Sequence, residues 1–229
     1  MVLTKLPVFV IIRRYQLRSI SMNTTAFKSG NPAISDFSCK SFKIFADDND
    51  HINCSFTLYF KGKRAASYTL DPWSGESKIT YVSLDMKDEI KDHAKANGLI
   101  DAAKNSYIES MKEFSSEERA IQLAEERDFS LEDVIDALRY VFQSEHEDKK
   151  FNAKIKRLCK NSIVVGNKEE YIPLTIREVK DFSELKKFKN GQEVLEKAFS
   201  RAKELVQQNS SLNYEILNTS EQLVELNLM

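Results

Sequence analysis

Apolar and polar residues alternate strictly between Ile52 and Phe60, which is the period of a half-buried β-strand. The apolar positions are Ile52, Cys54, Phe56, Leu58 and Phe60, and the polar positions between them are Asn53, Ser55, Thr57 and Tyr59. Since successive side chains of a strand point to opposite faces of a sheet, the pattern predicts one buried and one wetter face.

Turn signals divide the neighbouring sequence into further strands. Lys61-Gly62-Lys63 is a tight polar turn, because glycine adopts positive φ at no steric cost. A second turn occupies residues 71–75, and the acidic, Asn-containing residues 47–50 form a third. The strands predicted between these turns cover residues 37–46, 52–60, 64–70 and 78–84. They predict an antiparallel β-meander of four or more strands.

From Met86 onward the apolar spacing changes to the period of a helix. A first helix should end at Asn97-Gly98 with the glycine in the left-handed region, and a second should cover residues 99–114. Ser115 with Glu118 is a capping box that begins a third helix, and Ser130 with Asp133 begins a fourth. The strongest helical stripe follows, at Leu131, Val134, Ile135, Leu138, Val141 and Phe142. Further helices are predicted at residues 149–160, 178–188 and 192–208.

Two short β-rich runs lie within this helical region, at residues 163–165 and 171–176 around Gly166-Asn167. The tail from Leu212 is apolar at intervals and should dock on the body of the protein. The fold class is therefore α+β, an antiparallel meander followed by a mostly helical region with a small extra β element. We predict an N-terminal extension at 1–32, the meander at 33–85 and a helical region packed on it at 86–229.

The first thirty residues contain no acid but carry Lys5, Arg13, Arg14, Arg18 and Lys28. The apolar run at residues 6–12 is too short to span a bilayer, which takes about 20 residues. The segment is compatible with an extra strand, a secretory or organelle targeting peptide, or a mis-assigned start upstream of Met22. Whether residues 1–21 belong to the mature protein stays open at this point.

Composition describes an ordinary globular protein, with 41% hydrophobic and 30% charged residues. The net charge of −1 requires any nucleic-acid site to be a local patch. The three cysteines, Cys39, Cys54 and Cys159, have no metal-ligand or C-x-x-C spacing. They predict reduced, buried thiols in a cytoplasmic protein, with organelle targeting as the alternative.

Charge is segregated along the chain. Residues 115–148 hold eleven Asp or Glu, three Arg and no Lys, whereas 149–160 hold six cations and no acid. The cations are Lys149, Lys150, Lys154, Lys156, Arg157 and Lys160, and they fall within about 160° of a helical wheel. Phe151, Ile155 and Leu158 occupy the other side. This basic amphipathic helix could contact phosphates or an acidic partner, or it could dock by its apolar side with its cations solvated or paired.

Trp73 is the only tryptophan and stands in the turn at residues 71–75. A tryptophan at a hairpin tip is either an interface anchor or a cover for the sheet. We include Trp73 with the basic helix among the candidate partner-binding residues.

An enzymatic interpretation uses Glu76 and Lys78 with Asp71 upstream, an arrangement similar to the carboxylates and lysine of metal-dependent nucleases. The Glu-x-Lys spacing recurs along the chain, so it is a weak signal. His51, His93 and His146 lack metal-ligand spacing, and no phosphate loop or nucleophile motif is present. We therefore predict no catalytic residue, metal site or cofactor.

Three features together resemble the small α+β proteins of bacteriophages and plasmids. They are the strand-turn-strand at residues 56–68, the Asp-x-Trp-x-Gly turn at 71–75 and the Glu-Ile-Leu-Asn-Thr tail at 215–219. Some proteins of this kind bind and block host defence proteins, so the resemblance implies a binding role. It implies no functional residue.

The leading hypothesis is a non-catalytic protein that binds another protein. Nucleic-acid binding through residues 149–160 is the alternative, and a metal-dependent nuclease is the second alternative.

Overall fold

The structure is a computed structural model that describes residues 10–12, 15–16, 27, 31–46, 52–71, 76–112 and 114–229. The chain divides into two compact units. The central unit is Ser21–Glu147, and the terminal unit combines Met1–Ile20 with Asp148–Met229. The boundary at residues 147 and 148 falls inside helix α5 (Leu131–Leu158). The helices up to residue 147 belong to the same unit as the meander.

The central unit contains the predicted antiparallel meander. Its four strands are β3 (Phe37–Ala46), β4 (Ile52–Phe60), β5 (Lys63–Leu70) and β6 (Ser77–Tyr81), hydrogen-bonded in that order. Cys54, Phe56, Leu58 and Phe60 are all buried, as the alternation in β4 predicts. Lys61 and Gly62 join β4 to β5 with φ of 47° and 75°, and positive φ at both central residues is characteristic of a type I′ hairpin turn. The α+β fold class is confirmed.

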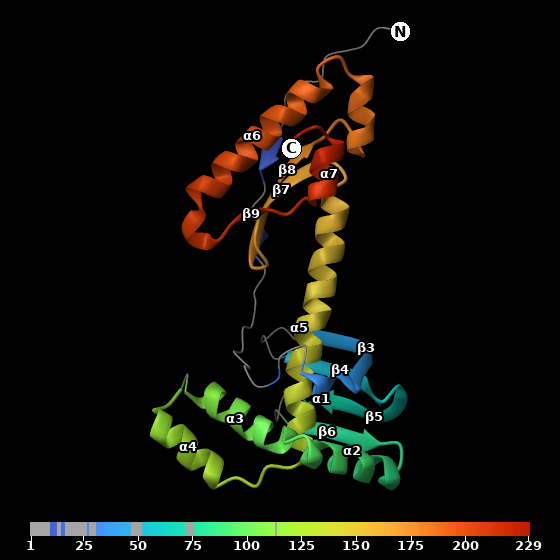
Figure 1. Ribbon diagram of the computed structural model, residues 1–229, viewed down its shortest axis with the longest axis vertical. Helices are drawn as coiled ribbons and strands as arrows, with labels where there is room; N and C mark the ends of the chain where they lie inside the picture. The colour runs from blue at the N-terminus through green and yellow to red at the C-terminus, as the bar shows by residue number, and fades with distance from the viewer. Residues whose placement is uncertain are drawn as a thin grey trace. The chain divides into compact units, whose positions relative to one another are not determined.

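Helices α1 (Pro32–Ser35), α2 (Leu84–Ala96), α3 (Leu99–Met111) and α4 (Glu117–Glu125) complete the central unit with the first part of α5 (Figure 1). Gly98, at φ 64°, separates α2 from α3 as predicted. The predicted cap of α4 is displaced by one residue, because Ser116, not Ser115, accepts the Arg119 N–H. The Ser115 hydroxyl instead donates to the Met111 carbonyl at the end of α3.

The prediction of separate helices before and after residue 149 is wrong, since α5 is one helix of 28 residues. Its interior contains no glycine or proline, so nothing in the backbone chemistry ends it between Phe142 and Lys149. The start was predicted correctly, and the Asp133 carboxylate accepts the Ser130 backbone N–H at 2.8 Å. The basic segment is therefore the second half of a longer helix, which ends at Leu158.

The terminal unit has its own antiparallel sheet in the order β1-β8-β7-β9, with β2 also paired to β8. Its strands are β1 (Val10–Ile12), β2 (Tyr15–Gln16), β7 (Ser162–Gly166), β8 (Glu170–Ile176) and β9 (Glu215–Ile216). The predicted hairpin around Gly166-Asn167 is the pair β7–β8. Of the alternatives for the N-terminal segment, the extra strand is seen at Val10–Ile12 and Tyr15–Gln16, which both pair with β8.

Helix α6 (Gly191–Gln208) packs against this sheet and buries residues such as Leu195, Ala198 and Ala202 (Figure 1). The helix predicted at residues 178–188 is instead a 3-10 helix at Phe182–Lys187, capped by the Asp181 side chain. The tail docks as predicted, because α7 (Ser220–Glu225) places Leu223 in the same core. None of the helices in the described ranges is both long and apolar enough to cross a membrane.

Candidate functional site

The six predicted cations lie on the second half of α5 and the residues just after it. We call this set the basic face: Lys149, Lys150, Lys154, Lys156, Arg157 and Lys160. All are exposed except Lys154, which is half-buried. The Lys154 ammonium lies 5.1 Å from the centre of the Tyr171 ring, so this lysine also packs against the sheet of the terminal unit.

The apolar side of the same segment holds it in place. Ile155 is buried in a cluster with Cys159, Val164 and Tyr171, and Phe151 and Leu158 pack against that cluster. Burial raises the pKa of the Cys159 thiol to about 12. The helical wheel therefore separated the packed and exposed sides of this segment, except at Lys154, which lies over Tyr171 of the cluster.

The exposed cations of the basic face are not neutralised by neighbouring acids. Within the described part of the chain, no carboxylate lies within 4.0 Å of Lys149, Lys150, Lys156, Arg157 or Lys160. The adjacent Asp148 pairs with Lys168 instead, at 2.8 Å. Hydrogen bonding from Ser183 lowers the pKa of Asp181, and Lys160 adds a smaller electrostatic contribution.

The near-zero net charge of the whole chain conceals a difference between its units. The terminal unit has 19 Lys or Arg against 12 Asp or Glu, whereas the central unit has 15 against 23. The basic face therefore belongs to a unit of net charge +7, and the acidic balance comes from the other unit.

Trp73, the other predicted partner-binding residue, lies outside the described residues. Its predicted role stays a prediction. The same applies to the acidic turn at residues 47–50 and to His51.

The residues of the nuclease hypothesis do come together. Asp71, Glu76 and Lys78 line one open cavity of about 600 Å³ beside β6, with Tyr81, Lys87 and Glu132 also on its wall. Lys87 pairs with Glu132 at 3.0 Å. Over the ranges that the structure describes, no group of three or more His, Cys, Asp or Glu could hold a metal ion. Asp71, Glu76 and Lys78 therefore lie near one another, but the described residues provide no set of ligands for a metal ion.

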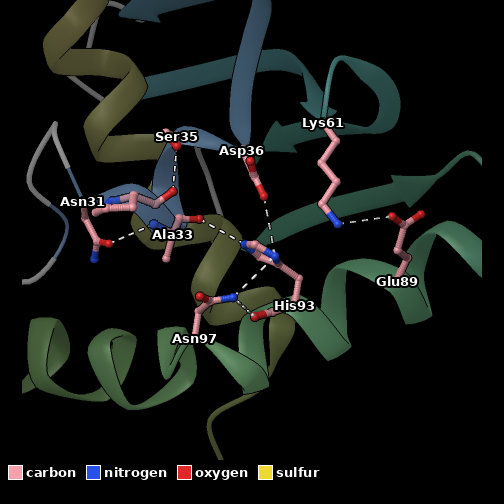
Figure 2. Close-up of polar contacts among 9 residues, drawn as sticks. Asn31, Ala33, Ser35, Asp36, Lys61, Glu89, His93 and Asn97 are labelled. Atoms are coloured by element: carbon pink, nitrogen blue, oxygen red, sulfur yellow. Dashed lines mark hydrogen bonds and ion pairs between the residues drawn. The ribbon is translucent and has the colours of Figure 1, made fainter.

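His93 serves the packing of the central unit. Its Nε2 lies 3.1 Å from the Ala33 carbonyl oxygen and its Nδ1 lies 3.7 Å from the Asp36 carboxylate. Figure 2 shows how the ring lies between these two groups. Its ring also contacts Phe37 and Phe60 edge-on. These contacts tie α2 to the segment that begins β3.

A polar cluster in the central unit was not predicted. The Asp136 carboxylate of α5 accepts hydrogen bonds from the Tyr68 hydroxyl at 2.7 Å and the Ser77 hydroxyl at 3.2 Å. Arg139, one turn along α5, is only 9% exposed. The sequence carries no clear signal for this cluster, since on a helical wheel Asp136 and Arg139 lie beside the apolar stripe of α5 and not within it.

No protein-family model, curated protein or solved structure shows a significant match to this chain. The candidate sites therefore rest on their own geometry and chemistry.

Proposed function

We propose that this protein binds nucleic acid without catalysis, through contacts between the basic face and the phosphate backbone. The observation that carries the proposal is a set of five exposed cations, four on α5 and Lys160 just after its end, with no carboxylate within ion-pair distance in the described structure. Exposed charges contribute little to folding stability, so their collection on one surface favours a role in binding.

The composition of the basic face favours a phosphate backbone over a protein surface. Five of its six residues are lysine, which is depleted in protein–protein interfaces but supplies many phosphate contacts. Its length also fits, because the helical part, residues 149–158, extends about 15 Å. Duplex DNA presents on the order of ten phosphate charges over that distance.

Such contacts are independent of base sequence. Each neutralised phosphate releases a counterion, so affinity should fall steeply as salt rises. The positive balance of the terminal unit adds long-range attraction for the same ligand.

The test measures fluorescence anisotropy of labelled short duplex DNA and single-stranded RNA over a range of salt concentrations. The variant is Lys150→Glu with Arg157→Glu, two exposed residues on the basic face. Lys154 is left intact because it packs on Tyr171. We expect weaker binding to every sequence, and a slope of log affinity against log salt reduced by about 2.

The matched control is Lys197→Glu with Arg201→Glu on α6, which changes charge equally within the same unit. Both of these cations are ion-paired, with Glu193 and Glu204. An equal loss of affinity in the control would place binding elsewhere on the unit. Absence of salt-dependent binding to either nucleic acid would overturn the proposal and leave the protein-partner hypothesis as the better account of the basic face.

A further inference from the structure

The central unit contains a cavity of about 230 Å³ between α3, the segment around Phe129 and the first part of α5. Its wall combines aromatic, hydroxyl and charged side chains. The residues used below are Ser106, Tyr107, Phe129, Arg139 and Tyr140. The proposed nucleic-acid site lies in the terminal unit, so this cavity is a separate feature.

Arg139 carries a buried donor in this cavity, its Nε, that lacks a partner, although Cys54 and Asp136 interact electrostatically with the guanidinium. It is 91% buried, and its Nε has no hydrogen-bond partner. Its guanidinium carbon lies 3.8 Å from the centre of the Tyr140 ring, and both residues line the cavity. A guanidinium stays charged at any physiological pH, so its burial without an ion pair is unfavourable. The Nε–H of Arg139 still needs a hydrogen-bond acceptor.

The two carboxylates of the cavity wall are already engaged. Asp133 pairs with Arg127 and accepts hydrogen bonds from the Ser130 backbone and hydroxyl. Asp136 accepts hydrogen bonds from Tyr68 and Ser77. In the described part of the chain neither of them lies within 4.0 Å of the Arg139 guanidinium.

The missing acceptor has the chemistry of a carboxylate. A planar carboxylate meets the side of a guanidinium with two parallel hydrogen bonds, one of them from Nε. The charged residues of the wall, Arg127, Arg139, Asp133 and Asp136, sum to zero formal charge, so a monoanion is repelled less by Asp133 and Asp136 than a dianion would be.

The rest of the cavity wall is largely aromatic and apolar, which suits a ring attached to the carboxylate. Tyr107 and Phe129 pack edge-to-face with ring centres 5.6 Å apart, and both line the cavity with Leu70, Ala103 and Ala137. A cavity of about 150 Å³ accommodates benzene. The larger volume here has room for one six-membered ring and its carboxylate.

We propose that this cavity binds a small carboxylic acid carrying a single ring, with the carboxylate on Arg139 and the ring against Tyr107 and Phe129. The site is a binding site and needs no chemical step. Benzoate is the simplest probe of this class, and benzamide is its neutral counterpart of nearly equal shape.

The experiment titrates the full-length protein with benzoate, benzamide and acetate, followed by calorimetry and by ligand-observed NMR. We expect benzoate to bind, acetate to bind more weakly because it has no ring, and benzamide to bind at least about tenfold more weakly because it has no charge. Equal affinity for benzoate and benzamide would overturn the role of Arg139. Absence of binding by all three at millimolar concentration would overturn the site.

Two variants locate the ligand. Arg139→Met removes the charge while keeping a long side chain, and should abolish the preference for benzoate over benzamide. Ser106→Leu fills the cavity from α3 and leaves Arg139 in place, so it keeps the test decisive if Arg139→Met does not fold. Benzoate binding unchanged in a folded form of either variant would contradict the assignment.

Discussion

The Tyr68 hydroxyl of β5 donates a 2.7 Å hydrogen bond to the Asp136 carboxylate of α5, across 68 residues of sequence. Tyr68 is 1% exposed and stacks on Phe56, with ring centres 4.6 Å apart. This bond fixes the position of α5 on the meander within the central unit, and it orients the turn of helix that carries Arg139.

Replacing Tyr68 by Phe should therefore destabilise the protein. The change leaves the ring packing intact but removes one of two hydrogen bonds to a carboxylate, which costs about 1–3 kcal/mol. Urea unfolding followed by circular dichroism gives the free energy. Tyr59→Phe, on the neighbouring strand, is the control, and an equal effect of both changes would contradict the importance of the Asp136 bond.

The same contact predicts a dependence on alkaline pH. Burial, followed by the hydrogen bond to Asp136, raises the pKa of Tyr68 far above its ordinary value. The unfolded chain then releases this proton near pH 10 while the folded protein retains it, so stability is full below that pH and falls as pH rises above it. We expect the free energy of unfolding to fall less in Tyr68→Phe than in the wild type. The measurement compares urea midpoints at neutral pH and at a pH above about 10.

The three cysteines should react at different rates. Cys54 and Cys159 are 1% and 3% exposed, whereas Cys39 is half-buried on β3. Burial raises the pKa of Cys54 and raises that of Cys159 to about 12, so little thiolate forms at neutral pH. Iodoacetamide labelling followed by mass spectrometry should modify Cys39 first, and the other two only when urea unfolds the protein. Early labelling of Cys159 would show that the apolar side of the basic segment is not packed.

Gly166 at the end of β7 should tolerate no side chain. Its φ is +149°, and a Cβ atom would lie 2.3 Å from the Glu170 carbonyl oxygen. Gly166→Ala should cost about 2–3 kcal/mol or more, since backbone strain and a backbone clash combine. Gly98→Ala is the comparison, because Gly98 has φ +64° but open space around it, and its cost should stay near 1–2 kcal/mol. Thermal unfolding of both variants tests this prediction. An equal or larger drop in the midpoint for Gly98→Ala would contradict it.

Asn218 should anchor the tail to the sheet of the terminal unit. Its side chain is buried, accepts the Val164 N–H at 2.8 Å and donates to the Ser162 carbonyl at 3.1 Å. Asn218→Ala leaves both backbone groups without these partners, at a cost of about 1–3 kcal/mol each. Hydrogen exchange of β7 and of residues 215–225 should speed up in this variant but not in Asn152→Ala, whose side chain is exposed on α5. Unchanged exchange would mean that apolar packing of Leu223 holds the tail alone.

The elements set by local chemistry were predictable from the sequence. The alternation of Cys54, Phe56, Leu58 and Phe60 identified a strand because side-chain direction in a strand has a period of two. Gly62 and Gly98 marked a turn and a helix end because both have positive φ. The two sides of the basic segment were also predictable, since a helical wheel needs only the positions of Ile155 and its neighbours.

Tertiary structure decided what depends on partners distant in sequence. A lysine of the basic face is paired or unpaired according to which acid lies beside it, and Asp148 pairs with Lys168, twenty residues away. Val10–Ile12 pairs with β8, which is distant in the sequence, and no local pattern specifies such a pairing. The sequence alone does not mark Arg139 as buried; the packing around α5 makes it a buried charge on the wall of a cavity.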